Sequence, residues 1–251
     1  MGELHVVEFT TYEASVPEAL DAVGAPELLA KQTAVMVKPN LINSSPPPIT
    51  TPVACCRAIV DYVRSHSKAT VVIAEGCGDA VHDTPAIFEM HGYTRLASEL
   101  GLELVDLNTA PTTLLRDDTC TVFPEFHMPE IAMSHFIISV PVLKAHSLAE
   151  ITGSMKNMMG LAPPKHYQRG GHWKKSCFHA RMHESIVELN TYRAPDLTLM
   201  DATVGMAEYH LGGAECDPPV NKLVAGTDAR EVDRVAAGLL GFDWTSIAHL
   251  A

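Results

Sequence analysis

The sequence predicts an α/β protein with a mostly parallel sheet and helices on both of its faces. Short runs rich in Val and Ile alternate along the chain with longer segments of helical periodicity. Several of the runs are apolar at successive positions, as expected of strands that are covered on both faces. Strand and helix in alternation is typical of this fold class. The predicted strands are 4–9, 33–38, 69–75, 102–107, 135–141, 197–202 and 222–227.

Four segments between these strands carry patterns that start helices. Two combine a capping hydroxyl with a proline at the first helical position. Two others place a capping side chain three residues before a glutamate, as in a capping box. These patterns are Thr51-Pro52, Thr84-Pro85, Ser147 with Glu150, and Asp228 with Glu231.

Length and composition predict one domain over residues 1–251. A chain of 251 residues that is 47% hydrophobic can bury a sizeable core. Two α/β lobes around a cleft, at about residues 1–134 and 135–251, are one arrangement of this domain. No apolar run reaches the roughly 18 residues that a membrane span needs, and the first residues, MGELHVVEFT, lack the pattern of a secretory signal.

Charge and cysteine usage narrow the class of protein further. A net charge of -12 argues against nucleic-acid binding, which needs a basic surface. The six cysteines are scattered along the chain, which suggests reduced thiols and a cytoplasmic location. Cys77 stands between two glycines at a strand end, and we interpret it as a small buried residue.

Polar residues follow directly after several predicted strands. The carboxyl ends of parallel strands meet at one edge of a sheet, and ligands bind in the crevice there. We therefore expect these side chains to converge on one cleft, although Asp201 and Asp228 also suit a purely structural role as caps. The residues are Lys38 and Asn40, Glu75, Lys144 and His146, Asp201, and Asp228.

Residues 144–184 are rich in lysine and histidine although the whole chain is acidic. Together with Lys38, the lysines Lys144 and Lys156 would create a positive field inside the cleft, suited to a carboxylate or phosphate. The predicted helix that starts at Ser147 would add free N–H groups. A lysine after a strand is also often a solvated edge residue, so the alternative of an ordinary surface stays open.

A metal site is a further interpretation of the same segment. His179 and His183 are spaced i, i+4, which places both imidazoles on one face of a helix. His172 lies nearby, and Asp201 or Glu184 could add oxygen, a set that suits Zn, Fe, Ni or Mn. A stripe of partly exposed histidines, or an anion site of imidazolium and lysine, fits equally. Residues 161–175 suit either a mobile lid or an exposed loop.

Six motifs in this order resemble the DUF362 family and cover most of the chain. They are VKPNL (37–41), VPVLKAH (140–146), TGSMKNMMGLAP (152–163), FHARMHE (178–184), DATVGM (201–206) and AGTDAREVDRVAAGLLG (225–241). The resemblance names a family without a general activity. Its members are often described as iron–sulfur-associated, because many are fused to ferredoxin-like modules.

The resemblance implies a set of site residues. The family's positions fall on Lys38 and Asn40, Glu75 and Gly76, Lys144 and His146, Lys156 and Asn157, Asp201, and Asp228 and Asp233. The family usually continues with a further C-terminal segment, so DWTSIAHLA suggests a short member or a missing part. The chain lacks a C-x-x-C-x-x-C series, so it carries no iron–sulfur cluster motif of the ferredoxin type.

Three functions are compatible with these observations. The first is an enzyme that binds a small anionic metabolite and performs acid/base or redox chemistry. It would use Lys144, His146 and Asp201 for catalysis, and Lys38, Asn40, Glu75, Lys156, Asn157 and Asp228 to bind the ligand. The second is a non-catalytic accessory that docks a ferredoxin-like redox partner. The third is a metal-dependent hydrolase that uses the histidines. A serine hydrolase is disfavoured because no G-x-S-x-G motif is present.

Overall fold

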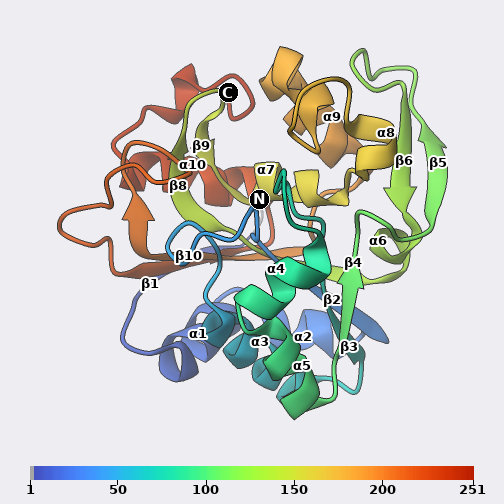
Figure 1. The fold of residues 1–251 in the computed structure, drawn as a ribbon. Helices are drawn as coiled ribbons and strands as arrows, with labels where there is room; N and C mark the ends of the chain where they lie inside the picture. The colour runs from blue at the N-terminus through green and yellow to red at the C-terminus, as the bar shows by residue number, and fades with distance from the viewer. Residues whose placement is uncertain (1–2) are drawn as a thin grey trace.

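A computed structural model describes residues 3–251, and it confirms the predicted α/β class. Nine strands form one large sheet, whose main path runs β1-β11-β10-β7-β2-β3-β4 (Figure 1). All seven predicted strands are present. They are β1 (Leu4–Glu8), β2 (Ala34–Pro39), β3 (Thr70–Glu75), β4 (Glu103–Asp106), β7 (Phe136–Val140), β10 (Leu197–Met206) and β11 (Lys222–Gly226).

The centre of the sheet is parallel, and one edge is antiparallel. Strands β10, β7, β2, β3 and β4 run in the same direction, while β11 and β1 run against their neighbours. β7 pairs with β2 in a register that sets Lys38 opposite Ser139. The sheet therefore joins strands from both of the ranges predicted as lobes.

Helices cover both faces of the sheet (Figure 1). In β2, neighbouring Met36 and Val37 pack into different hydrophobic clusters, because successive side chains of a strand point to opposite faces. The helices against one face are α1 (Tyr12–Asp21), α2 (Ala25–Leu29), α3 (Val53–His66), α4 (Thr84–Met90) and α5 (Tyr93–Leu100). Those against the other are α7 (Ser154–Asn157), α9 (Met182–Tyr192) and α10 (Ala229–Leu239).

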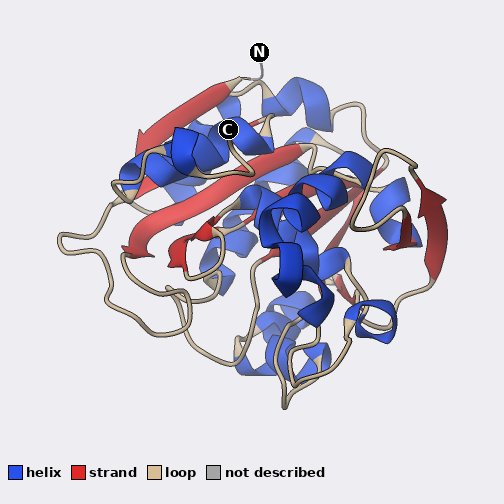
Figure 2. Cartoon of the chain, turned by 90° about the horizontal axis from the view of Figure 1, so that it is seen from above, coloured by secondary structure: helices blue, strands red, loops and turns tan. Residues whose placement is uncertain are grey.

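Smaller elements complete the fold. A two-stranded antiparallel pair, β5 (Thr112–Arg116) and β6 (Glu125–Pro129), lies at one side of the molecule (Figure 2). The others are α6 (Glu130–Ser134), α8 (Pro164–Tyr167), and the 3₁₀ helices η1 (Met158–Leu161), η2 (Ser176–Arg181) and η3 (Trp244–Ser246). No helix within residues 3–251 is long and apolar enough to cross a membrane.

The prediction of a helix that starts at Ser147 is wrong. Residues 147–149 form a turn between two antiparallel strands, β8 (Val142–His146) and β9 (Glu150–Thr152). β8 pairs with the outer part of β10, so the chain stays extended past β7. The pairing with β10 outweighs the local capping signal, because tertiary contacts override local propensity.

The other helix starts fall close to their predicted positions. Asp228 caps α10, where its carboxylate accepts hydrogen bonds from the amides of Arg230 and Glu231. Asp83, and not Thr84, caps α4. Thr51 precedes α3 without capping it, and its hydroxyl donates to the carbonyl of Val140 at 2.7 Å.

Candidate functional site

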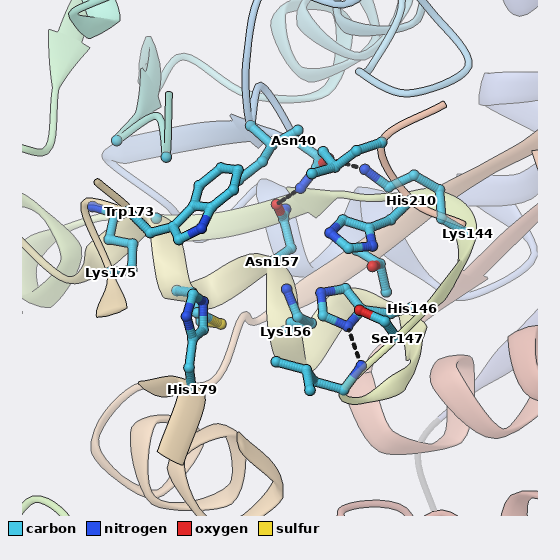
Figure 3. A pocket seen from close by; sticks show the side chains of 18 of the residues that line it. Asn40, Lys144, His146, Ser147, Lys156, Asn157, Trp173, Lys175, His179 and His210 are labelled. Carbon is cyan, nitrogen blue, oxygen red and sulfur yellow. Dashed lines mark hydrogen bonds between the residues drawn. The ribbon is translucent and has the colours of Figure 1, made fainter. Parts of the chain in front are cut away.

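A cavity of about 230 Å³ opens past the carboxyl ends of β2 and β3 and beside β8. It therefore lies at the edge of the sheet where the sequence predicts a cleft. Trp173 and His179 lie on one side of it, and His146 and His210 on the other (Figure 3). The polar lining residues are Asn40, Glu75, Lys144, His146, Ser147, Thr152, Lys156, Asn157, Lys175, His179, Tyr209 and His210.

Three lysines line this cavity, namely Lys144, Lys156 and Lys175. The Lys144 ammonium donates to Asn40 Oδ1 at 2.8 Å and to the carbonyl of Ile49 at 2.7 Å. The Lys175 ammonium donates to Asn108 Oδ1 and to the carbonyl of Ala162. None of the three forms an ion pair with a carboxylate within residues 3–251. An excess of positive charge is therefore concentrated in one place of an acidic protein.

Burial lowers the pKa values of all three lysines. Burial, with a smaller contribution from the Lys156 ammonium, lowers the pKa of Lys144 to about 7, although the Glu75 carboxylate opposes the shift. Burial lowers the pKa of Lys175 to about 7 and that of Lys156 to about 8. Near neutral pH each amine can thus be charged or neutral, and a nearby anion would favour the charged form.

Glu75 is the only acidic side chain among the lining residues that the structure describes, and it is already paired. Lys38 Nζ lies 2.9 Å from both of its carboxylate oxygens, and the lysine is fully buried. Asn157 braces the pair, since its side-chain amide donates to the carbonyl of Lys38 and to Ser139 Oγ. This carboxylate is therefore committed to Lys38 and leaves the other lysines without a counter-ion.

His146 and His210 form a stacked pair in the cavity wall, with ring centroids 3.8 Å apart. His146 Nδ1 accepts hydrogen bonds from the amides of Leu148 and Ala149, at 3.0 and 3.2 Å. In the neutral ring this assigns the proton to Nε2, which points toward Lys156 (Figure 3). Burial, followed by the Lys156 ammonium, lowers the pKa of His146, and the same causes lower that of His210 to about 3. Both imidazoles are thus neutral donors or acceptors at pH 7.

A buried aspartate fixes the helix that carries Lys156. Asp233 of α10 accepts hydrogen bonds from the amides of Ser154 and Met155, at 2.5 and 2.9 Å. Burial raises the pKa of Asp233 to about 7, and the two backbone hydrogen bonds oppose that rise. Since these two amides are occupied, they are not free to bind a ligand, unlike the N–H groups expected at the start of a helix at Ser147.

The structure brings together most of the residues predicted to bind a ligand. Asn40, Glu75, Lys144, His146, Lys156 and Asn157 line the cavity, and Lys38 contacts it through Glu75. Asp201 and Asp228 are not among the lining residues. Asp201 is buried and accepts a hydrogen bond from the Tyr12 hydroxyl at 2.6 Å, and Asp228 caps α10.

The three histidines predicted as metal ligands lie apart. His179 lines the cavity, whereas His183 contacts His249 and Glu150, and His172 is exposed in a loop. His179 lies in η2 and His183 in α9, so the two do not share the face of one α-helix. Within residues 3–251 no group of three or more His, Cys, Asp or Glu side chains is arranged to hold a metal ion.

Sequence reasoning missed several lining residues, among them Thr152, Lys175 and His210. The predicted strand 197–202 stops too early, because β10 continues to Met206. A prediction that placed the end of this strand at Met206 would have indicated His210 as a residue that follows a strand. Lys175 lies at the end of the predicted loop 161–175, and no signal in the sequence distinguishes it from Lys174.

The fold and the cavity together define an α/β protein with a lysine- and histidine-lined cavity at the carboxyl edge of a parallel sheet. The chain belongs to the family described as "Domain of unknown function (DUF362)", whose profile matches residues 35–238. This confirms the resemblance found in the motifs.

One solved structure extends the comparison of the fold. It is the lactate racemase apoprotein from Thermoanaerobacterium thermosaccharolyticum, with a TM-score of 0.54 and 12% sequence identity. The likeness covers 78% of this chain and 49% of the other, so this chain spans about half the length of that protein. At this identity the likeness shows a shared fold. No curated protein matches the chain.

Proposed function

We propose that this protein is an enzyme that binds a small organic carboxylate in the cavity and moves a proton to or from it. The observation that carries the proposal is the convergence of Lys144, Lys156 and Lys175, without carboxylate partners, on a wall that also holds a pair of neutral imidazoles. Such a positively charged cavity favours an anion.

The imidazole pair supplies the acid/base groups. His146 Nε2–H is placed to donate a hydrogen bond to a carbonyl or carboxylate oxygen of the ligand, as a neutral imidazole can. His210 lines the cavity beside His146, so its imidazole is placed to accept a proton from the ligand. Burial, followed by the charge of the lysines, holds the imidazole pKa values low, and a bound anion offsets the lysine charge. The ligand itself therefore makes His210 a stronger base.

Calorimetric titration tests the binding step. Lactate is a suitable first probe, because the structurally similar protein is a lactate racemase apoprotein. Propionate and inorganic phosphate test carboxylate against phosphate, and glycerol serves as a neutral control. We expect the carboxylates to bind the full chain, and a Lys144→Met variant to bind them at least about tenfold more weakly, as expected for a lost charged hydrogen bond.

A matched control is Lys165→Met, since Lys165 is exposed and lies outside the cavity. It should bind as the wild type does. Proton transfer is then followed by NMR as exchange of the ligand's C2 hydrogen for deuterium, which a His210→Ala variant should lose. Equal binding of glycerol and carboxylates, or unchanged binding in Lys144→Met, would contradict the proposal.

We also propose that the protein acts in the cytoplasm. All six cysteines are free, and four of them are buried. Free thiols persist in a reducing compartment. Fractionation of cells that produce the protein tests this location.

A further inference from the structure

Lys156 differs from the other lysines of the cavity in its surroundings. No hydrogen-bond acceptor within residues 3–251 contacts its Nζ, whereas Lys144 and Lys175 each donate to two oxygens. Two hydrogens of each of those amines are therefore engaged by protein oxygens, whereas no protein acceptor within the described residues engages the amine of Lys156. Among the lysines of the cavity, Lys156 is thus the one whose amine makes the fewest hydrogen bonds to protein acceptors.

Lys156 lies close to several ionisable groups of the cavity. Burial, followed by the Lys156 ammonium, lowers the pKa values of Lys144, His146, His179 and His210. Burial lowers the pKa of Lys156 to about 8, so about a tenth of the amine is neutral at pH 7. A desolvated lysine near other cationic groups is the setting in which lysine becomes a nucleophile.

Hydrogen bonds fix the helix that carries this amine. Asp233 secures the start of α7, and Ser154 Oγ lies 2.6 Å from Thr198 Oγ1 of β10. α7 is therefore anchored to both the helix layer and the sheet. A nucleophile on such an anchored segment loses little freedom when it reacts.

We propose that Lys156 forms an imine with the carbonyl carbon of a 2-oxo acid bound in the cavity. The proposal rests on the proposed function, because the carboxylate of the acid would be held by Lys144, on the side of the cavity where His146 and His210 lie (Figure 3). A 2-oxo acid places its carbonyl next to that carboxylate, within the part of the cavity that Lys156 and His146 share (Figure 3).

The reaction balances without an oxidant or reductant. The lone pair of the neutral Lys156 amine forms the C–N bond, and the carbonyl π pair moves to oxygen, which accepts a hydrogen bond from His146. His210 carries one proton from the nitrogen to that oxygen and gives a carbinolamine. The second amine proton then leaves with the hydroxyl group as water, and the C=N bond forms.

Reductive trapping tests the proposal on the full chain. The protein is incubated with pyruvate and sodium cyanoborohydride, digested, and mapped by mass spectrometry. We expect the reduced adduct on Lys156. Propionate, which lacks the oxo group, should compete for the cavity and form no adduct.

Lys156→Arg separates charge from nucleophilicity, because arginine keeps the positive charge and cannot form the imine. Circular dichroism confirms its fold, and calorimetry measures its binding of pyruvate. We expect retained binding and complete loss of the adduct, while Lys165→Arg keeps the wild-type adduct.

The outcomes distinguish the two proposals. Pyruvate that binds without forming an adduct, or an adduct on Lys144 or Lys175 instead, overturns the imine and leaves the carboxylate site standing. Failure of every carboxylate to bind overturns both.

Discussion

The ammonium of Lys38 lies 2.9 Å from each carboxylate oxygen of Glu75, and this buried pair closes the cavity at the ends of β2 and β3. Gly160 packs directly against the pair, where a Cβ atom would collide with both side chains. The backbone of Gly160 in turn crowds Gly76. Gly76 and Gly160 therefore allow the end of β3 and η1 to approach each other closely.

Glu75→Gln should destabilise the protein by about 3 kcal/mol, because it leaves the Lys38 ammonium buried without its counter-ion. Urea unfolding followed by circular dichroism measures the change. The double variant Lys38→Met/Glu75→Gln should recover part of this loss, since no buried charge remains. A double variant less stable than Glu75→Gln alone would contradict this account.

Lys156→Met should stabilise the fold while it weakens carboxylate binding at least about tenfold. Removing a partly buried ammonium that no protein acceptor within residues 3–251 contacts should raise the free energy of unfolding by about 1 kcal/mol. For a chain of this length that corresponds to a rise in Tm of about 2 to 4 °C. Differential scanning calorimetry without ligand checks the rise, and a lower Tm would show that Lys156 supports the fold.

Carboxylate affinity should fall as the pH rises through about 7 to 8. The lowered pKa values of Lys144 and Lys175, about 7, and of Lys156, about 8, mean that the lysines lose charge in this window. A carboxylate ligand stays ionised throughout, so its affinity follows the lysines. Titrations at about pH 6 and pH 9 should differ by at least about tenfold. The paired Glu75 and the neutral imidazoles of His146 and His210 do not reverse the trend, and a constant affinity would exclude a lysine-based site.

Asp233→Ala should cost about 2 to 4 kcal/mol and weaken carboxylate binding, because two buried amides of α7 lose their acceptor and Lys156 loses its anchor. Asp228→Ala on the same helix is the matched control. It removes an exposed cap and should cost about 1 kcal/mol with no change in binding. Chemical denaturation and calorimetry are compared for the two variants. Equal effects on binding would argue against a positioning role for Asp233.

The central fold could be predicted from the sequence because the buried strands carry a strong local signal. Strands such as β2 and β7 are apolar on both faces, which only a covered parallel sheet explains well. β8 was not predicted, because its polar residues Lys144 and His146 follow an apolar run and suggest the end of a strand. The capping pattern at Ser147 strengthened that error.

The candidate site could be predicted in part, because one geometric rule places residues after parallel strands at a common edge. That rule brought Asn40, Glu75 and Lys144 together correctly. It does not say which way a side chain points, and Asp201 turns toward Tyr12. His210 was missed because β10 runs past the predicted strand end, and Lys175 reaches the cavity from a loop whose course depends on tertiary packing and has no local signal.

The amides of Ser154 and Met155 at the start of α7 are occupied by Asp233, and the positive charge of the cavity is carried by lysine side chains. A helix N-terminus would favour an anionic ligand in every protein that keeps the fold. A lysine, in contrast, can be replaced by a single mutation. Members of such a lineage could therefore acquire neutral or cationic substrates while keeping the same backbone.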